Sequence, residues 1–165
     1  MRENSRRAGR GFSLIELMFV VAIAAVIAAV AIPSYNNQVR KNNRAVAKAR
    51  LAQAAQLMER FYSDNNSYFV DVSGGNLAVG TNSTAAGFAK LMNVASGTTV
   101  YSGSNNESTS PYTITVTTAS ANVFTLTATV VTGSPQAGDT KCMNLTLTNA
   151  GVKGISGTGT LPDCW

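Results

Sequence analysis

An apolar run extends from Phe12 to Ile32, and only Ser13 and Glu16 within it are polar. As an α-helix, these 21 residues would extend about 31 Å. The hydrocarbon core of a bilayer is about 30 Å thick, so the run is long enough to cross a membrane. The sequence therefore predicts one spanning helix close to its N-terminal end.

Positive charge gathers ahead of this run. The chain has 13 Lys and Arg against 8 Asp and Glu, a formal net charge of +5. Residues 1–11 contribute +3 of it, because they hold one glutamate and four arginines: Glu3, Arg2, Arg6, Arg7 and Arg10. Basic residues beside a spanning helix hold that end in the cytoplasm. Without residues 1–11 the net charge is +2, which weakens a nucleic-acid function argued from charge alone.

Glu16 is the one charged residue in the apolar run. Ser13 to Glu16 has the S-x-x-E pattern of a capping box, and a carboxylate is favourable near the positive end of the helix dipole. A charge one turn inside a spanning helix still costs about 2 to 3 kcal/mol unless its side chain snorkels. A cut after Gly11 would supply a partner, because the new α-amino group of Phe12 would lie one helical turn from Glu16.

An ordinary secretory signal peptide is the alternative interpretation. Its basic region, apolar region and small-residue site would correspond to the arginines, the apolar run and the "AVA" that ends at Ala31. A cut after Ala31 would remove Glu16 and release a secreted, soluble, β-rich binding domain.

The stretch "GFSLIELMFVVAIAAVIAAVAIPSY" closely resembles the class III signal and N-terminal helix of type IV pilins, with Gly11, Phe12, Glu16 and Pro33 on the fixed positions of that pattern. The resemblance covers about residues 8 to 62, and the ending "LTLTNAGVKG...DCW" is similar to that of PilE-type minor pilins. It implies that prepilin peptidase cuts after Gly11 and methylates Phe12. It also implies that Glu16 neutralises the N-terminal amine of a neighbouring subunit during filament assembly.

One position departs from the pilin pattern. Pilins usually have a glycine in the middle of the apolar stretch, whereas Ala25 stands there in this chain. Glycine would cost about 1 kcal/mol of helix stability relative to alanine, so unwinding between Ala25 and Pro33 is less strongly encoded. Pro33 still predicts a kink, since it lacks an amide donor and its ring clashes with the preceding turn.

The helix is expected to continue to about Ser63, where "SDNNS" should end it. Apolar residues recur at spacings of three, four or seven, which predicts a stripe that packs on a sheet. They are Tyr35, Val39, Val46, Ala47, Leu51, Ala54, Ala55, Met58, Phe61 and Tyr62.

A second face of this helix is basic. Arg40, Arg44 and Lys48 follow one another at i, i+4 and i+8, and Lys41 joins them. We expect a solvated or subunit-facing surface paired with acids such as Asp64, Asp71, Glu107 or Asp139. Contact with lipid head groups or with DNA is the alternative, although no aromatic residues interleave with these charges.

Composition changes after the helix. Residues 68–110 are rich in Gly, Ser, Asn and Ala and read as a loop region, with a short helix at 84–93 and a first strand near 98–102. Strict apolar alternation then predicts three antiparallel strands, at 112–117, 124–130 and 143–148, with Met143 on the apolar face. The expected fold class is α+β, a long N-terminal helix whose C-terminal half packs on a small antiparallel sheet.

Cys142 and Cys164 are the only cysteines. Outside the cytoplasm, an even pair is most simply a disulfide, which would tie the Gly-rich tail to the last long strand. Metal binding is the rival, and the chain has no histidine to support it. In pilins, by resemblance, such a C-terminal disulfide loop is a surface for subunit contact and adhesion.

The sequence indicates a structural subunit and not an enzyme, because it lacks histidine, a phosphate-binding loop and any nucleophile with a base. No cofactor is expected.

The chain is expected to divide into four segments. They are a removed leader (1–11), a transmembrane and filament-core helix (12–33), its amphipathic continuation (34–63) and a β domain with the disulfide loop (64–165).

The resemblance implies a type IV pilus subunit, of the minor class, that supports adhesion, twitching motility or DNA uptake. A type II secretion pseudopilin is the alternative. The expected partners are other pilin subunits, prepilin peptidase, the inner-membrane assembly machinery and lipid before assembly. DNA binding is possible but is not indicated by the sequence. Before assembly, the chain should be anchored in the inner membrane with its C-terminal domain in the periplasm. After assembly, it should be part of the extracellular fibre.

Overall fold

The computed structural model describes residues 12–95, 97–103 and 108–165. The chain divides into two compact units, Met1–Val39 and Arg40–Trp165. Helix α1 (Leu14–Asn65) belongs to both units and agrees closely with the predicted extent. Asn66, with φ of 53°, ends it within the predicted "SDNNS" segment, because a left-handed residue cannot continue a helix.

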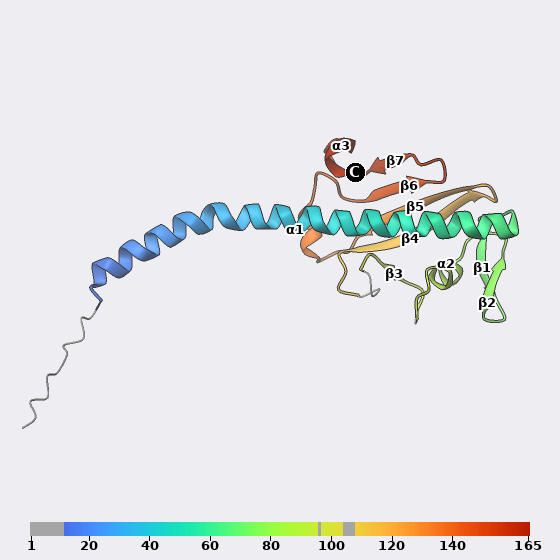
Figure 1. Ribbon diagram of the computed structural model, residues 1–165, viewed down its shortest axis with the longest axis horizontal. Coiled ribbons are helices and arrows are strands. Elements are labelled where there is room, and N and C mark those ends of the chain that lie inside the picture. Colours follow the sequence, from blue (N-terminus) through green and yellow to red (C-terminus); the bar gives the residue numbers. More distant parts are fainter. Residues whose placement is uncertain (1–11, 96, 104–107) are drawn as a thin grey trace, which may run out of the picture. The chain divides into compact units, whose positions relative to one another are not determined.

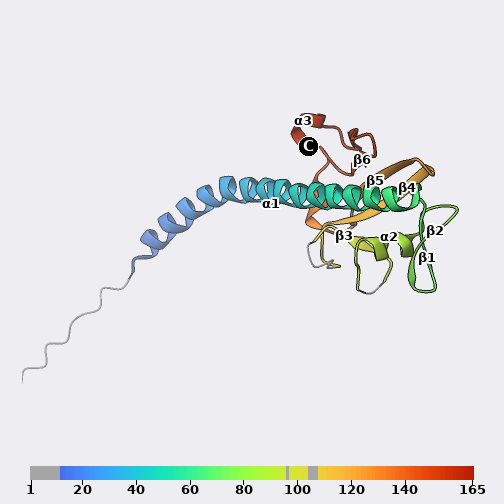
Figure 2. The ribbon, with the colours of Figure 1, turned by 45° about the vertical axis from the view of Figure 1, so that its right-hand side comes forward.

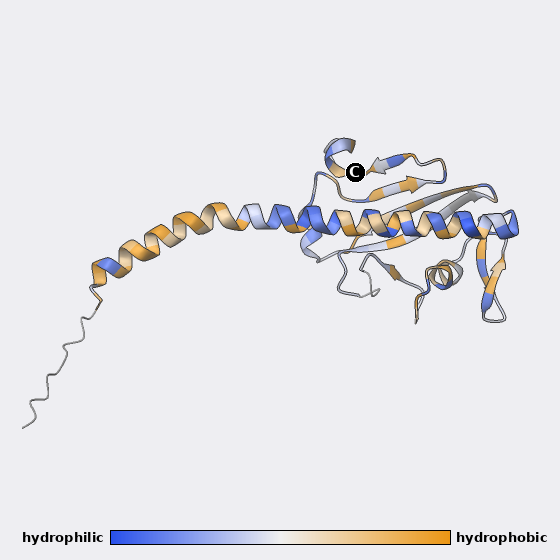
Figure 3. Ribbon diagram, in the orientation of Figure 1, coloured by the Kyte–Doolittle hydropathy of each residue, from blue (hydrophilic) through white to orange (hydrophobic). Residues whose placement is uncertain are grey.

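In the first unit, the part of α1 from Leu14 to Ile32 is mostly apolar and almost entirely exposed, and it is drawn largely orange in Figure 3. It is long and apolar enough to cross a membrane, and none of its most apolar window is buried in the molecule. Pro33 lies inside α1, with helix on both sides. Apolar side chains that a folded domain does not cover need a lipid or protein environment.

The second unit contains a five-stranded antiparallel sheet of order β3-β4-β5-β6-β7. The C-terminal part of α1 lies across one face of this sheet (Figures 1 and 2). The strands are β3 (Val100–Tyr101), β4 (Tyr112–Ser120), β5 (Val123–Val130), β6 (Leu145–Thr148) and β7 (Lys153–Ile155). The predicted α+β fold class is confirmed.

The apolar stripe of α1 packs on the alternating residues of the sheet. Ala47, Leu51, Ala54, Met58 and Phe61 are buried against side chains from β4, β5 and β6: Tyr112, Ile114, Phe124, Leu126, Ala128 and Leu145. The stripe was predicted too broadly, since Tyr35 is 70% exposed and Val46 is 37% exposed. Arg50, which was not part of it, is buried instead.

The predicted loop region at 68–110 is partly wrong, because it contains a hairpin of β1 (Val70–Ser73) and β2 (Asn76–Val79). Gly74 and Gly75 form its turn with φ of 56° and 79°, which glycine adopts without steric cost. The predicted short helix is α2 (Ala85–Leu91), capped by the Thr84 hydroxyl. The first predicted strand is β3, shorter than expected.

One prediction about the C-terminal strands is wrong. Met143 has φ of 46°, lies before β6 and is 40% exposed, so it does not belong to the apolar face. The sheet contains β3 and the three later predicted strands, and it adds β7, which the sequence did not predict. The 3-10 helix η1 (Pro135–Gly138) and the short helix α3 (Leu161–Cys164) flank these strands.

Candidate functional site

Near the start of α1, the structure describes Phe12 and Glu16. Phe12 is 76% exposed and Glu16 is exposed as well. The Ser13 carbonyl accepts a hydrogen bond from the Leu17 amide at 3.2 Å, so Ser13 stands at the cap position of the helix. Gly11, the predicted cleavage position, lies outside the described residues. The roles of Gly11, Phe12 and Glu16 therefore stay predictions.

Cys142 and Cys164 form the predicted disulfide, with 2.03 Å between the sulfur atoms and 5.6 Å between the Cα atoms. Backbone hydrogen bonds hold the tail in place, from the Gly159 amide to the Lys141 carbonyl at 2.8 Å and from Gly157 to Cys142 at 3.3 Å. A side chain at residue 157 would collide with the Lys141 carbonyl, which explains a glycine there. The tail is thereby fixed beside β6.

The last residue completes the tail. The Trp165 indole N–H donates to the Gly154 carbonyl at 2.9 Å, and the Lys153 ammonium lies 5.2 Å from the centre of the indole ring. Both contacts join the end of the chain to β7. The chemically distinctive part of the second unit is therefore a tail held by a disulfide, an indole hydrogen bond and a cation–π contact.

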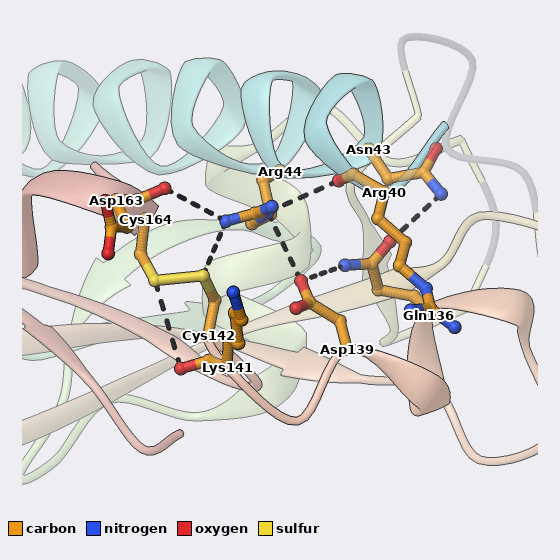
Figure 4. Close-up of polar contacts among 9 residues, drawn as sticks. All are labelled: Arg40, Asn43, Arg44, Gln136, Asp139, Lys141, Cys142, Asp163 and Cys164. Carbon is orange, nitrogen blue, oxygen red and sulfur yellow. Dashed lines mark hydrogen bonds and ion pairs between the residues drawn. A yellow bond between two sulfur atoms is a disulfide. The ribbon is translucent and has the colours of Figure 1, made fainter. Parts of the chain in front are cut away.

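Arg44 connects this tail to α1 (Figure 4). Its Nε lies 3.2 Å from Asp139 Oδ2, and the two side chains are only 11% and 6% exposed. Its Nη1 donates to the Asp163 carbonyl at 3.1 Å and contacts the Cys142 sulfur. Of the acids predicted for the basic face, Asp139 is thus confirmed as a partner. Glu107 lies outside the described residues.

Neutral side chains complete the surroundings of Asp139. The Gln136 amide donates to Asp139 Oδ2 at 2.8 Å, and Asn43 donates to Gln136 Oε1 at 3.1 Å. We call Asn43, Arg44, Gln136 and Asp139 the Arg44 cluster. The sequence did not identify Asn43 or Gln136, because their roles depend on the approach of η1 to α1, a contact of residues 93 positions apart.

Asp71, another acid considered as a partner of the basic face, instead forms hydrogen bonds with residues near α2. Its Oδ1 accepts hydrogen bonds from the Thr84 hydroxyl and the Val72 amide, each at 2.8 Å. These bonds, with that of Thr84 the larger cause, lower the pKa of the Asp71 carboxyl. Asp71 therefore stabilises the start of α2.

Cations surround the disulfide. Lys41, Arg44 and Lys48 line a groove of about 230 Å³ together with Asp163 and Cys164. Lys141 and Lys153 are exposed on the neighbouring segments. Since the Arg44 guanidinium is paired internally, the charge offered to a ligand comes from four lysines. We call Lys41, Lys48, Lys141 and Lys153 the basic tail surface.

The comparisons with known proteins point to pili. Residues 6–32 match the prokaryotic N-terminal methylation motif. The chain is 44% identical over 62 residues to the type IV wide pilus major component PilA4 of Thermus thermophilus, covering 38% of this chain and 47% of PilA4. It is 36% identical over 85 residues to the type IV major fimbrial protein FimA of Dichelobacter nodosus, covering 47% of this chain and 54% of FimA.

The matches to these curated relatives span about half of their length. A family match covers more of the chain, at residues 33–146, and that family is described as type IV minor pilin ComP, DNA uptake sequence receptor. The match includes the second half of α1, both hairpin strands and the sheet through β5. With the methylation motif ahead of it and the long helix packed on an antiparallel sheet, the chain belongs to the ComP family of type IV minor pilins.

Proposed function

We propose that this chain is a minor structural subunit of a type IV pilus that takes part in DNA uptake. The observation that carries the proposal is the ComP family match over residues 33–146, directly after the N-terminal methylation motif at 6–32. The exposed apolar part of α1 supports assembly, because side chains left uncovered in one subunit can pack against those of its neighbours.

Assembly requires a mature N-terminus. Prepilin peptidase cuts the precursor after Gly11 and methylates Phe12. Before assembly, the apolar run holds the chain in the inner membrane, with the second unit in the periplasm, and the pilus machinery then moves it into the extracellular fibre. Glu16 neutralises the α-amino group of a neighbouring subunit, so that neither charge is left unpaired in the fibre. Pro33 bends α1 where the apolar run ends.

DNA contacts the basic tail surface. The lysines neutralise backbone phosphates, which supplies affinity that does not depend on sequence. Base recognition needs other side chains that reach into a groove of the duplex. The Trp165 ring lies beside Lys153, and Thr158 and Thr160 are exposed on the same tail. Disulfide closure keeps the tail in one conformation and thereby lowers the entropy lost on binding.

The mature protein and its DNA affinity can be measured together. Intact mass of sheared fibres should show a chain of residues 12–165 with one added methyl group. Duplex DNA should bind the detergent-solubilised chain with an affinity that falls as salt rises. Lys141→Gln with Lys153→Gln should reduce the slope of log Kd against log salt by about 0.9 for each lost phosphate contact.

A matched control and two further observations distinguish the proposed function from its alternatives. Lys90→Gln removes a lysine from α2, far along the chain from the tail, and should leave the salt slope unchanged. An N-terminus at Ile32 would identify a secreted β-rich domain instead of a pilin. Presence of the chain only in a secretion complex, without fibres, would favour the type II secretion pseudopilin.

A further inference from the structure

Arg50 is a buried cation without an acidic partner in the described residues. It lies on the C-terminal half of α1 and is only 9% exposed. Its Nη1 donates to Gln53 Oε1 at 2.8 Å, a neutral acceptor on the same helix. Its Nε is buried and has no acceptor among the described side chains and backbone. Arg44, on the same helix, is as buried but has a carboxylate.

An open groove lies beside Arg50. Val46, Ala49, Arg50, Gln53 and Ser102 line its volume of about 300 Å³ between α1 and the end of edge strand β3. The Ser102 hydroxyl is buried and also lacks a hydrogen-bond partner within the part of the chain that the structure describes. The groove therefore combines one cation, one free hydroxyl, one amide and two small apolar surfaces.

Burial makes the charged form of Arg50 less favourable. Removal from water lowers the pKa of the Arg50 guanidinium. A buried cation is normally retained with an anion, because desolvation is unfavourable unless an opposite charge offsets it. In the free subunit this offset is absent among the described groups, so the position is more easily explained by an anion that arrives from outside.

We propose that this groove receives the carboxylate of one aspartate or glutamate side chain from a neighbouring pilin subunit in the fibre. The proposal rests on the proposed function, since it needs a fibre. The planar guanidinium matches a carboxylate in geometry, and the Ser102 hydroxyl and Gln53 amide can donate to its oxygens. Val46 and Ala49 contact the methylene groups of the incoming side chain.

A DNA phosphate fits this groove less well. The backbone of a duplex presents a row of phosphates, which suits several exposed cations such as the basic tail surface. Here Arg50, nine-tenths buried, is the only charged side chain among the described residues that line the groove. One carboxylate side chain supplies the single opposite charge that this groove lacks among its described residues.

The proposal predicts opposite effects on the subunit and on the fibre. Arg50→Gln should leave the thermal stability of the solubilised, unassembled chain unchanged or raise it, because an uncompensated charge is removed. Co-expressed with the unmutated chain, the variant should enter sheared fibres at least about tenfold less, equivalent to about 1.4 kcal/mol. Arg50→Lys keeps the positive charge but loses the planar, paired donors of the guanidinium, so its incorporation into fibres should lie between those of the unmutated chain and Arg50→Gln.

Arg60→Gln is the matched control, because it removes an exposed arginine from the same helix and should enter fibres normally. A photo-crosslinker at Gln53 should join a neighbouring pilin in assembled fibres, at a peptide that contains Asp or Glu. Charge exchange between that acid and Arg50 should restore incorporation.

Several results would overturn the inference. Equal incorporation of Arg50→Gln would do so, as would a loss of DNA affinity with normal incorporation, which would assign the groove to phosphate. Lower thermal stability in both Arg50→Gln and Glu107→Gln would mean that the chain supplies its own anion. If the unmutated chain also stayed out of fibres, the proposed function itself would fail.

Discussion

Arg44 on α1 and Asp139 after η1 form an ion pair of 3.2 Å in which both side chains are almost fully buried. The same guanidinium also donates to the Asp163 carbonyl in the disulfide-closed tail. One arginine therefore holds three segments together: the helix, the loop before Cys142 and the end of the chain. A residue of the predicted basic face is in this way part of the interior.

Asp139→Asn should strongly destabilise the second unit. The substitution leaves Arg44 buried without an opposite charge, which typically costs about 3 to 5 kcal/mol. Urea unfolding of the solubilised chain, followed by circular dichroism, measures the loss. Lys48→Gln, on the same face but without a buried partner among the described residues, should change the free energy of unfolding by less than about 0.5 kcal/mol. Similar effects from the two variants would contradict a structural role for the pair.

Loss of the disulfide should release the tail. Cys142→Ser is expected to lower the free energy of unfolding by about 2 to 5 kcal/mol, because the unfolded chain regains the entropy of a loop that spans 22 positions. Leader cleavage should be unaffected. A reductant should lower the melting temperature of the unmutated chain but not that of a variant with both cysteines replaced by serine. A reductant effect on that double variant would point to another cause.

Alkaline solution should destabilise the second unit through two tyrosines. Burial, followed by the Glu59 hydrogen bond, raises the pKa of Tyr68 to about 12. Burial, followed by the charge of Asp139, raises the pKa of Tyr112 to about 12. Between pH 10 and 12 the unfolded chain, with tyrosine pKa values of about 10, loses protons that the folded chain retains.

The stability contributed by these hydroxyls is therefore complete below about pH 10 and declines above it, by on the order of 1 kcal/mol per tyrosine at pH 11. Urea unfolding at pH 8 to 11 measures this decline. Tyr68→Phe with Tyr112→Phe should flatten it, whereas Tyr35→Phe, at an exposed position in the first unit, should not. An unchanged slope in the double variant would exclude the two buried tyrosines as its source.

Gly11→Val should block leader cleavage. The peptidase must bind an extended backbone at the membrane surface, and a β-branched side chain at the cut would obstruct that approach. The uncleaved chain would remain in the membrane, 11 residues longer than the mature form. Intact mass or gel mobility detects the difference, and normal cleavage would show that the site lies elsewhere.

Glu16→Ala should be made, inserted and cleaved, but should enter fibres poorly. In the fibre the Phe12 α-amino group would be buried without a carboxylate, and such a loss costs about 3 to 5 kcal/mol. Glu16→Gln should recover only part of the loss, since it accepts a hydrogen bond but carries no charge. The ratio of mutant to unmutated subunits in sheared fibres measures the effect. Equal incorporation of mutant and unmutated subunits would show that Glu16 acts only as a helix cap.

The long helix, most of its apolar stripe and the paired cysteines could be predicted from the sequence. Each follows from a local or periodic signal: an apolar run of known length, recurrence near 3.6 residues, and an even cysteine count. The β1–β2 hairpin also has a local signal, the adjacent Gly74 and Gly75, but glycine fits an irregular loop equally well. Met143 was misplaced because alternation alone cannot reveal a left-handed residue just before a strand.

Which polar groups lie in the interior depends on tertiary contacts that the sequence does not reveal. Arg44 and Arg50 occupy neighbouring turns of one helix and look alike in the sequence, yet one meets Asp139 and the other faces a groove without a carboxylate among the described residues. That difference depends on which loop approaches each turn of α1, and such contacts join residues distant along the chain. The spacing of apolar residues predicts which side of a helix is covered, but it does not predict which chemical group covers it.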